Sequence, residues 1–482
     1  MQSNHVSSKS NAALFWVLLI TIAWLPIPLG SNRVWSWSLM ELLVFAIAAC
    51  LIAAHLIWQN QQLAVLKKLK IPLGFLIAWL VFHWVQLIPI PIEILEVISP
   101  ATVELHYYLY GENFADSSLR LSLGIGETLQ ATLKDIAYVT LFMLVVVLVN
   151  SRLRIHQMAM MLVYAGTANA FFGIINYFTQ GQFGFFKPAS WWGQAISGTY
   201  INPNHFAGLM ELCLPIALGL IMAEHQQQRF YPNFKARLRG MLEFMLSRKV
   251  LLYLFAVIMF AGIFLSSSRG GIASLLTALV LGLVLFRFAR PTNVPQMRIG
   301  MIIVPLVVLT VGWFGVGGFI AKLENAGLDS DRGLIREAIY PLIADYPLFG
   351  TGAGTFEQIF TLYKNNMLGL SVYDHSHNDY LELLSEQGII GFLLMGLAIL
   401  SAYWRIIKCL GLRRNAQLRG ILFGVVVGTL SLLIHAWVDF NFQIPANAAI
   451  FWCLMGLGIS CSLVKSKKAR AINEQTKSQI PE

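Results

Sequence analysis

Long apolar stretches alternate with short polar segments along most of the chain. About twelve of these stretches are long enough to cross a bilayer, because a spanning helix needs roughly 20 apolar residues. Their centres lie near residues 21, 48, 81, 141, 167, 214, 258, 279, 309, 398, 429 and 455. The composition agrees, with 57% hydrophobic and 12% charged residues. The pattern predicts an all-α, polytopic membrane protein.

Positive charge is concentrated in alternate polar segments, which is how a membrane protein encodes its orientation. If the N-terminus is cytoplasmic, 25 of the 34 Lys and Arg residues fall on the inner side. Lys and Arg near span ends are retained in the cytoplasm. We therefore predict that both termini are cytoplasmic. The net charge of +10 arises from these short inner loops, so it gives no indication of nucleic-acid binding.

This orientation divides the chain into four predicted parts. Residues 1–320 form nine spans with short loops, and residues 321–387 form a large periplasmic loop domain. Residues 388–465 form three more spans, and residues 466–482 form a basic cytoplasmic tail. The large loop is predicted to contain two short helices on either side of a glycine-rich bend. Because it is the longest outer segment, it is the candidate functional domain.

The polar end of this loop carries the most chemically suggestive residues. His375 and His377 precede Asn378 just before an apolar stretch, and Arg332 and Arg336 share one face of the first predicted loop helix. Guanidinium groups bind phosphate oxygens through two parallel hydrogen bonds. A histidine accepts a proton near neutral pH. This combination suits a lipid diphosphate sugar as donor and a hydroxyl group as acceptor.

Other interpretations of these residues remain open at this point. His375 and His377 with nearby carboxylates are plausible metal ligands, although neighbouring arginines would repel a dication. Arg269, in a very short outer connection, also reads as a snorkelling arginine. Asn202 and Asn204 are candidates for a helix cap, or for contacts with substrate hydroxyls. The alternative function is a polytopic transporter or flippase of lipid-linked or anionic substrates.

Taken together, four motifs resemble the O-antigen ligase and polymerase superfamily. They are Ser268-Arg269-Gly270, the segment 347–356 after Arg332, His375-Ser376-His377-Asn378, and the segment 386–391. The resemblance implies a bacterial inner-membrane enzyme of about twelve spans with a large periplasmic loop. It also implies a GT-C-like fold and a metal-independent glycosyltransferase without a cofactor.

The resemblance further implies partners and residue roles. The donor is an undecaprenyl-diphosphate-linked glycan, the acceptor is a glycan or the lipid A-core, and both are presented in membrane lipid. Arg269 and Arg332 would bind the diphosphate, with Arg336 as a less secure addition. His377 would be the catalytic base, with His375 as the alternative. Possible glycan or acceptor contacts are Asn202, Asn204 and Asn378. These motifs do not separate ligases, polymerases and protein O-oligosaccharyltransferases.

Overall fold

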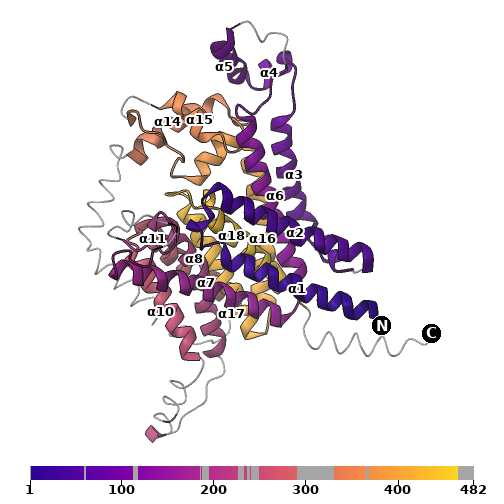
Figure 1. Ribbon diagram of the computed structural model, residues 1–482, viewed down its shortest axis with the longest axis vertical. Helices are drawn as coiled ribbons and strands as arrows, with labels where there is room; N and C mark the ends of the chain where they lie inside the picture. The colour runs from indigo at the N-terminus through magenta and orange to yellow at the C-terminus, as the bar shows by residue number, and fades with distance from the viewer. Residues whose placement is uncertain are drawn as a thin grey trace, which may run out of the picture.

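The computed structural model describes residues 2–58, 61–111, 118–184, 186, 195–225, 233–235, 239, 249–289, 331–364 and 368–464. In these residues the chain is helical (Figure 1), and β structure is limited to one antiparallel bridge between Ile90 and Leu119. Eight described helices are long and apolar enough to cross a membrane. They are α2 (Val34–Trp58), α6 (Ile125–Leu148), α7 (Arg152–Phe178), α8 (Pro203–His225), α11 (Arg269–Ala289), α16 (Asp379–Leu412), α17 (Ala416–His435) and α18 (Pro445–Leu463).

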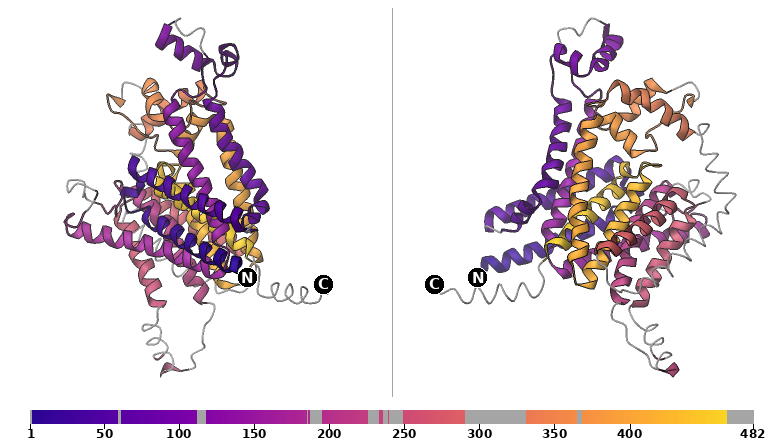
Figure 2. Two further views of the ribbon diagram at one scale, coloured as in Figure 1. Left: turned by 45° about the vertical axis from the view of Figure 1, so that its right-hand side comes forward. Right: turned by 180° about the vertical axis from the view of Figure 1, so that it is seen from behind.

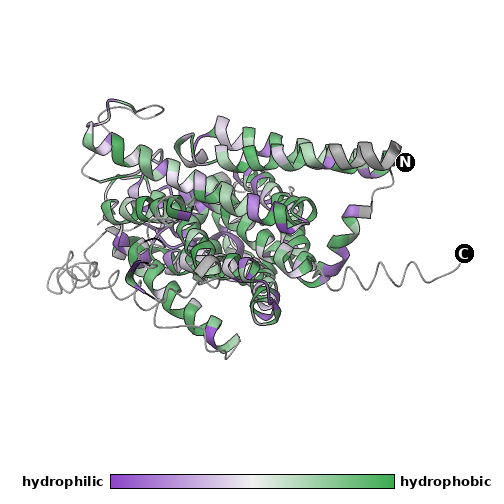
Figure 3. Ribbon diagram, turned by 90° about the horizontal axis from the view of Figure 1, so that it is seen from below, coloured by the Kyte–Doolittle hydropathy of each residue, from purple (hydrophilic) through white to green (hydrophobic). Residues whose placement is uncertain are grey.

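These eight helices coincide with eight of the predicted spans, which confirms a polytopic α-helical membrane protein. Three further predicted spans are also helical, in α1 (Gln2–Trp24), α3 (Lys70–Leu87) and α10 (Lys249–Leu265). The predicted span near residue 309 lies outside the described residues. The total of about twelve spans therefore stays a prediction. Figure 3 shows that the bundle helices are predominantly hydrophobic.

The centre of the bundle is formed by α8, α17 and α18. In an apolar 18-residue stretch of α8 and of α17, 83% of the residues are buried, and in the corresponding stretch of α18 the share is 89%. Close contact between α8 and α17 depends on glycine: a Cβ at Gly420 would lie 1.9 Å from the Gly219 carbonyl oxygen. Small residues allow such close backbone approach between membrane helices. As a result, the first turns of α8 lie beside the last turns of α17.

The long helix α16 is broken near its N-terminal end by Gly388. This residue has φ 58°, and a Cβ there would lie 2.3 Å from the Leu348 carbonyl oxygen. Across the break, the Ile389 backbone N–H donates to the Pro347 carbonyl at 2.9 Å. Only glycine combines this conformation with this close approach. The predicted glycine-rich bend is also present, with positive φ values at Gly350, Gly352 and Gly354, and it is packed against the start of α16.

Two short helices flank this bend, as predicted. They are α14 (Asp331–Asp345) and α15 (Phe356–Tyr363), and they share a small core that includes Ile339, Leu342 and Phe360. Figure 1 and Figure 2 show α14 and α15 stacked on one end of the span bundle. From the same end project α4 (Ile92–Ile98) and α5 (Pro100–Tyr110). The candidate loop residues thus lie above the ends of the spans.

Candidate functional site

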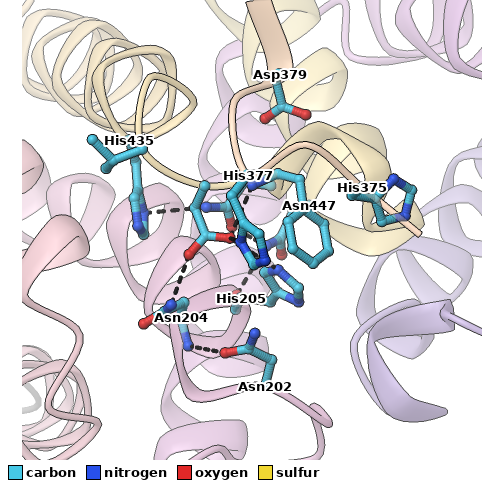
Figure 4. Close-up of polar contacts among 12 residues, drawn as sticks. Asn202, Asn204, His205, His375, His377, Asp379, His435 and Asn447 are labelled. Carbon is cyan, nitrogen blue, oxygen red and sulfur yellow. Dashed lines mark hydrogen bonds and ion pairs between the residues drawn. The ribbon is translucent and has the colours of Figure 1, made fainter. Parts of the chain in front are cut away.

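A buried carboxylate, Asp439, lies where several of the predicted site residues meet. It is only 1% exposed and follows the end of α17. Its Oδ2 accepts a hydrogen bond from Asn204 Nδ2 at 2.7 Å and lies 3.5 Å from an Arg332 guanidinium nitrogen. Its Oδ1 lies 3.5 Å from His205 Nε2 and 3.7 Å from His377 Nδ1. Figure 4 shows that the side chains of Asn204, His205 and His377 lie close together.

The environment of Asp439 keeps it ionised. Burial alone would raise its pKa, but the neighbouring His205 and His377 imidazoles outweigh burial and hold the pKa well below its usual value. Both imidazole contacts are longer than a normal hydrogen bond, and neither facing nitrogen has another partner among the described residues. Catalytic hydrogen bonds often tighten only when substrate is bound. The arrangement therefore suits a carboxylate that orients an imidazole.

His377 has an unusual backbone conformation that aims its ring at this carboxylate. Its φ is 55°, a left-handed value that non-glycine residues adopt infrequently and at a cost of about 1 to 3 kcal/mol. The ring packs edge-on against Phe440, with centroids 4.8 Å apart. Nδ1 is buried and faces Asp439. Nε2 is therefore the nitrogen of His377 that is available to a ligand.

His375, two residues earlier, contacts a different carboxylate. Its Nδ1 lies 2.8 Å from Glu382 Oε1, and Glu382 Oε2 accepts from the Ser376 backbone N–H at 2.7 Å. Burial tends to lower the pKa of His375, but the Glu382 carboxylate outweighs burial and raises it above 6.5. The two imidazoles of the motif thus face different acids, although both rings pack on Phe440.

Two of the candidate asparagines cap helices. Asn378 is the N-cap of α16, and its side-chain oxygen accepts from the backbone N–H groups of Tyr380 and Leu381 at 3.0 and 3.1 Å. Asn202 accepts from the Asn204 backbone N–H at 2.8 Å, just before α8 begins. The cap prediction for Asn202 is confirmed, and Asn378 is a cap as well. Asn204 instead directs its own amide to Asp439.

The predicted diphosphate-binding arginines border the turn that precedes Asp439. Arg332 donates to the Val438 carbonyl oxygen at 3.2 Å. Arg269 is the exposed first residue of α11, and a Cβ on the next residue, Gly270, would lie 3.2 Å from Val438. The N-terminus of α11 adds a partial positive charge. Arg336 lies one turn after Arg332 and has no ion pair among the described residues.

Sequence reasoning missed Asp439 and His205. Two sequence features could have indicated them. Asp439-Phe440-Asn441 is a polar run between two apolar stretches, and Asn204-His205 lies at the start of another apolar stretch. A second buried pair lies nearby, because His435 Nδ1 is 2.7 Å from Glu211 Oε1. Ser431 also donates to Glu211, at 2.5 Å. This pair supports the end of α17 against α8.

The fold and the site define a polytopic helical membrane protein with histidine, carboxylate and arginine side chains gathered at one end of its spans. The family described as O-antigen ligase matches residues 254–396. This match supports membership of the chain in the O-antigen ligase superfamily and confirms the resemblance inferred from the motifs. Such membership implies a glycosyltransferase-type enzyme acting on lipid-linked glycans in a membrane. A search of curated proteins found no match.

Proposed function

We propose that this protein is a membrane glycosyltransferase that transfers or polymerises an undecaprenyl-diphosphate-linked glycan on the periplasmic face of the bacterial inner membrane. One observation carries the proposal: Arg332 and His377, assigned to leaving-group binding and to proton removal, both approach Asp439, at 3.5 and 3.7 Å. A diphosphate leaving group and an attacking hydroxyl need these two chemistries side by side.

The reaction follows from the placement of these groups. The acceptor hydroxyl oxygen attacks the anomeric carbon of the donor, and His377 Nε2 takes the hydroxyl proton. The bond between the anomeric carbon and the diphosphate oxygen breaks, and undecaprenyl diphosphate leaves with the electron pair. Arg269 and Arg332 stabilise the charge that develops on the diphosphate. His375 remains the alternative base, and Arg336 an additional phosphate ligand.

Asp439 has two roles in this proposal. As an anion beside Nδ1, it favours the tautomer of His377 that leaves Nε2 unprotonated, and it stabilises the imidazolium formed after proton transfer. It also positions Arg332, whose side chain is 45% exposed and so retains donors for a ligand. Asn204 fixes Asp439 through the 2.7 Å hydrogen bond to Oδ2.

Helix direction supports a site on the periplasmic side with cytoplasmic termini. Near the cluster, α17 ends, while α8, α11, α16 and α18 begin. The far end of α16 is followed by Arg413 and Arg414, and α17 begins beside Arg419. Because basic residues favour the cytoplasm, the opposite end with the cluster is assigned to the periplasm.

The decisive experiment separates glycosyl transfer from transport. The protein in nanodiscs is given a donor, which is lipid-linked glycan extracted from a strain in which the gene for this protein is deleted. The acceptor is either lipid A-core or more of the lipid-linked glycan. A transferase consumes the donor, releases undecaprenyl diphosphate and extends the acceptor. A flippase in vesicles moves intact glycolipid between leaflets with no release of undecaprenyl diphosphate, and that result would overturn the proposal.

The surface polysaccharide of the deletion strain then distinguishes the two branches of the reaction. A ligase defect leaves full-length polymer that is not attached to its acceptor. A polymerase defect removes long chains but leaves acceptors capped with single repeats. Both patterns agree with the proposed glycosyltransferase, and each assigns the acceptor as lipid A-core or as a second glycan.

A further inference from the structure

A cavity of about 200 Å³ lies beside the candidate site, in a different part of the bundle. Its walls come from α3, α6, α16 and α18, and Ala353 and Gly354 of the glycine-rich bend also border it. By contrast, the groups around Asp439 come from α8, α14 and the loop before α16. The cavity is therefore a separate space, which extends from the same end of the spans to Gly396 and Ile399 near the middle of α16.

A buried carboxylate with an unused oxygen lines this cavity. Asp379 is 7% exposed, and its Oδ2 accepts from the Phe442 backbone N–H at 3.1 Å. Its Oδ1 is buried without a hydrogen-bond partner among the described residues. Gln443 also lines the cavity, and no described residue hydrogen-bonds its side-chain amide. Buried polar groups are nearly always paired, so Asp379 Oδ1 indicates a ligand that supplies a hydrogen bond, and the half-buried Gln443 offers a second polar contact.

Aliphatic and aromatic side chains line most of the other cavity walls, and Lys134, Asp135 and Glu386 add charge. Tyr138, Phe392, Phe442 and Trp452 border the space. Phe442 packs edge-on against Phe451 with centroids 4.9 Å apart, so its ring is held in place. A hydroxyl-bearing sugar ring suits these walls, because its hydroxyls can donate to Asp379 and Gln443 while its C–H faces lie on aromatic rings. A polyprenyl chain would leave both polar groups unpaired.

The cavity is linked to the candidate base through two short stretches of chain. Asp379 lies two residues after His377, and Phe442 lies two residues after Phe440, the ring against which His377 packs. A sugar bound at Asp379 would thus lie next to the imidazole, approaching from the side of α3 and α6. The arginines border the other side of the site, at Val438.

We propose that this cavity binds a glycosyl ring of the acceptor and so presents an acceptor hydroxyl to His377. The proposal rests on the glycosyltransferase function above, since only a transferase has an acceptor. It adds a second substrate site whose residues the donor does not need. Asp379 and Gln443 would bind the sugar hydroxyls, and the aromatic rings would hold the sugar plane.

Gly396 offers a clean way to fill the cavity. It lines the space, and a Cβ added there meets no atom within 4 Å. Gly74 on α3 has the same freedom on an exposed surface outside the cavity and is the matched control. We expect Gly396→Phe and Asp379→Asn to raise the acceptor KM roughly tenfold, the effect of losing one good contact. Gly396→Ala and Gly74→Phe should leave both KM values near wild type.

The donor KM decides the assignment. If Gly396→Phe and Asp379→Asn raise the donor KM and leave the acceptor KM unchanged, the cavity does not bind the acceptor. The proposal is also overturned if neither KM changes in the two variants. Thermal unfolding of each variant in nanodiscs shows whether that variant is folded. If Asp379→Asn does not fold, Gly396→Ala and Gly396→Phe still test the cavity, because they fill it with side chains of increasing size.

A labelling experiment tests the cavity without relying on transfer. In a Cys50→Ser background, Gly396→Cys is labelled with N-ethylmaleimide in nanodiscs. The probes are two soluble fractions released by mild acid from the strain that lacks this protein: the core oligosaccharide, and the glycan cleaved from its polyprenyl diphosphate. Slower labelling with either fraction supports a glycan-binding cavity, and unchanged labelling with both opposes it. If labelling slows while the wild type transfers no glycan, the cavity binds glycan but the proposed transferase function is wrong.

Discussion

Two histidines separated by one residue are distinguished by the acids that they face. His377 Nδ1 lies 3.7 Å from Asp439, which also binds Asn204 and approaches Arg332. His375 contacts Glu382, which also accepts from the Ser376 backbone. The neighbours of His377 come from distant segments that carry the candidate donor site. The ring of His375 also packs on Phe440, with centroids 4.6 Å apart, but the acid that it faces lies only seven residues further along the chain, so His377 is the better placed base.

Replacing each histidine separately tests this difference. We expect His377→Ala to lower the transfer rate by roughly 10² to 10⁴, the usual contribution of a general base, while donor binding changes little. His375→Ala should retain most of the activity. Rates are measured with purified protein in nanodiscs, with and without a chelator. An inactive His375→Ala with an active His377→Ala would reverse the assignment, and loss of wild-type activity on chelation would favour a metal site.

Replacing Asp439 by asparagine tests whether its charge orients the base. Asp439→Asn keeps the shape of the side chain but removes the anion beside Nδ1, so the favoured tautomer of His377 is lost. We expect transfer to fall by about 10² or more, with the unfolding temperature little changed. Asp374→Asn, an exposed aspartate in the same loop, is the control and should stay active. A wild-type rate in Asp439→Asn would contradict the orienting role.

At the scale of elements, the sequence predicted features that depend on local residue patterns, but it did not predict contacts between distant segments. The apolar pattern located the spans, and Asn202 was recognisable as a cap because asparagine before an apolar run satisfies free backbone N–H groups. The break in α16 at Gly388 was not predictable, since its cause is the approach of Leu348 from another segment. The role of Asp439 was equally hidden, because it depends on glycine contacts that place α8 beside α17.

The turn before α16 should lose stability as pH rises. In the folded protein, burial tends to lower the pKa of His375, but the Glu382 carboxylate outweighs burial and the pKa is raised. The stabilisation is therefore complete below the unfolded pKa, near 6.5, and is lost as pH rises through the folded pKa. We expect the unfolding temperature of the wild type to be a few degrees higher than that of His375→Gln at pH 6. This difference in unfolding temperature should shrink by pH 9.

Unfolding temperatures in nanodiscs across this pH range measure the effect. Glu382→Gln removes the partner charge and is the matched variant. In that background, His375→Gln should cause little further change at any pH. A difference between wild type and His375→Gln that stays constant from pH 6 to pH 9 would show that the ion pair does not stabilise the turn.

At the scale of the whole molecule, the site depends on helix ends from distant parts of the chain meeting at one end of the bundle. The last turns of α17 and the first turns of α8, α11, α16 and α18 lie there, under α14 and α15. The hydrophobic pattern and the charge pattern predicted which ends share a side. The orientation of the bundle in the membrane stays a prediction that both the donor and the acceptor proposals require.

Single cysteines on either side of α16 test this orientation. Leu370, before the helix, is 98% exposed, and Leu412, at its last residue, is 72% exposed. In a Cys50→Ser background, which removes the exposed native thiol, Leu370→Cys should react with a membrane-impermeant maleimide in intact spheroplasts. Leu412→Cys should react only after permeabilisation, because basic residues hold that end in the cytoplasm. The reverse pattern would place the arginines and His377 in the cytoplasm, where a periplasmic glycan donor could not reach them.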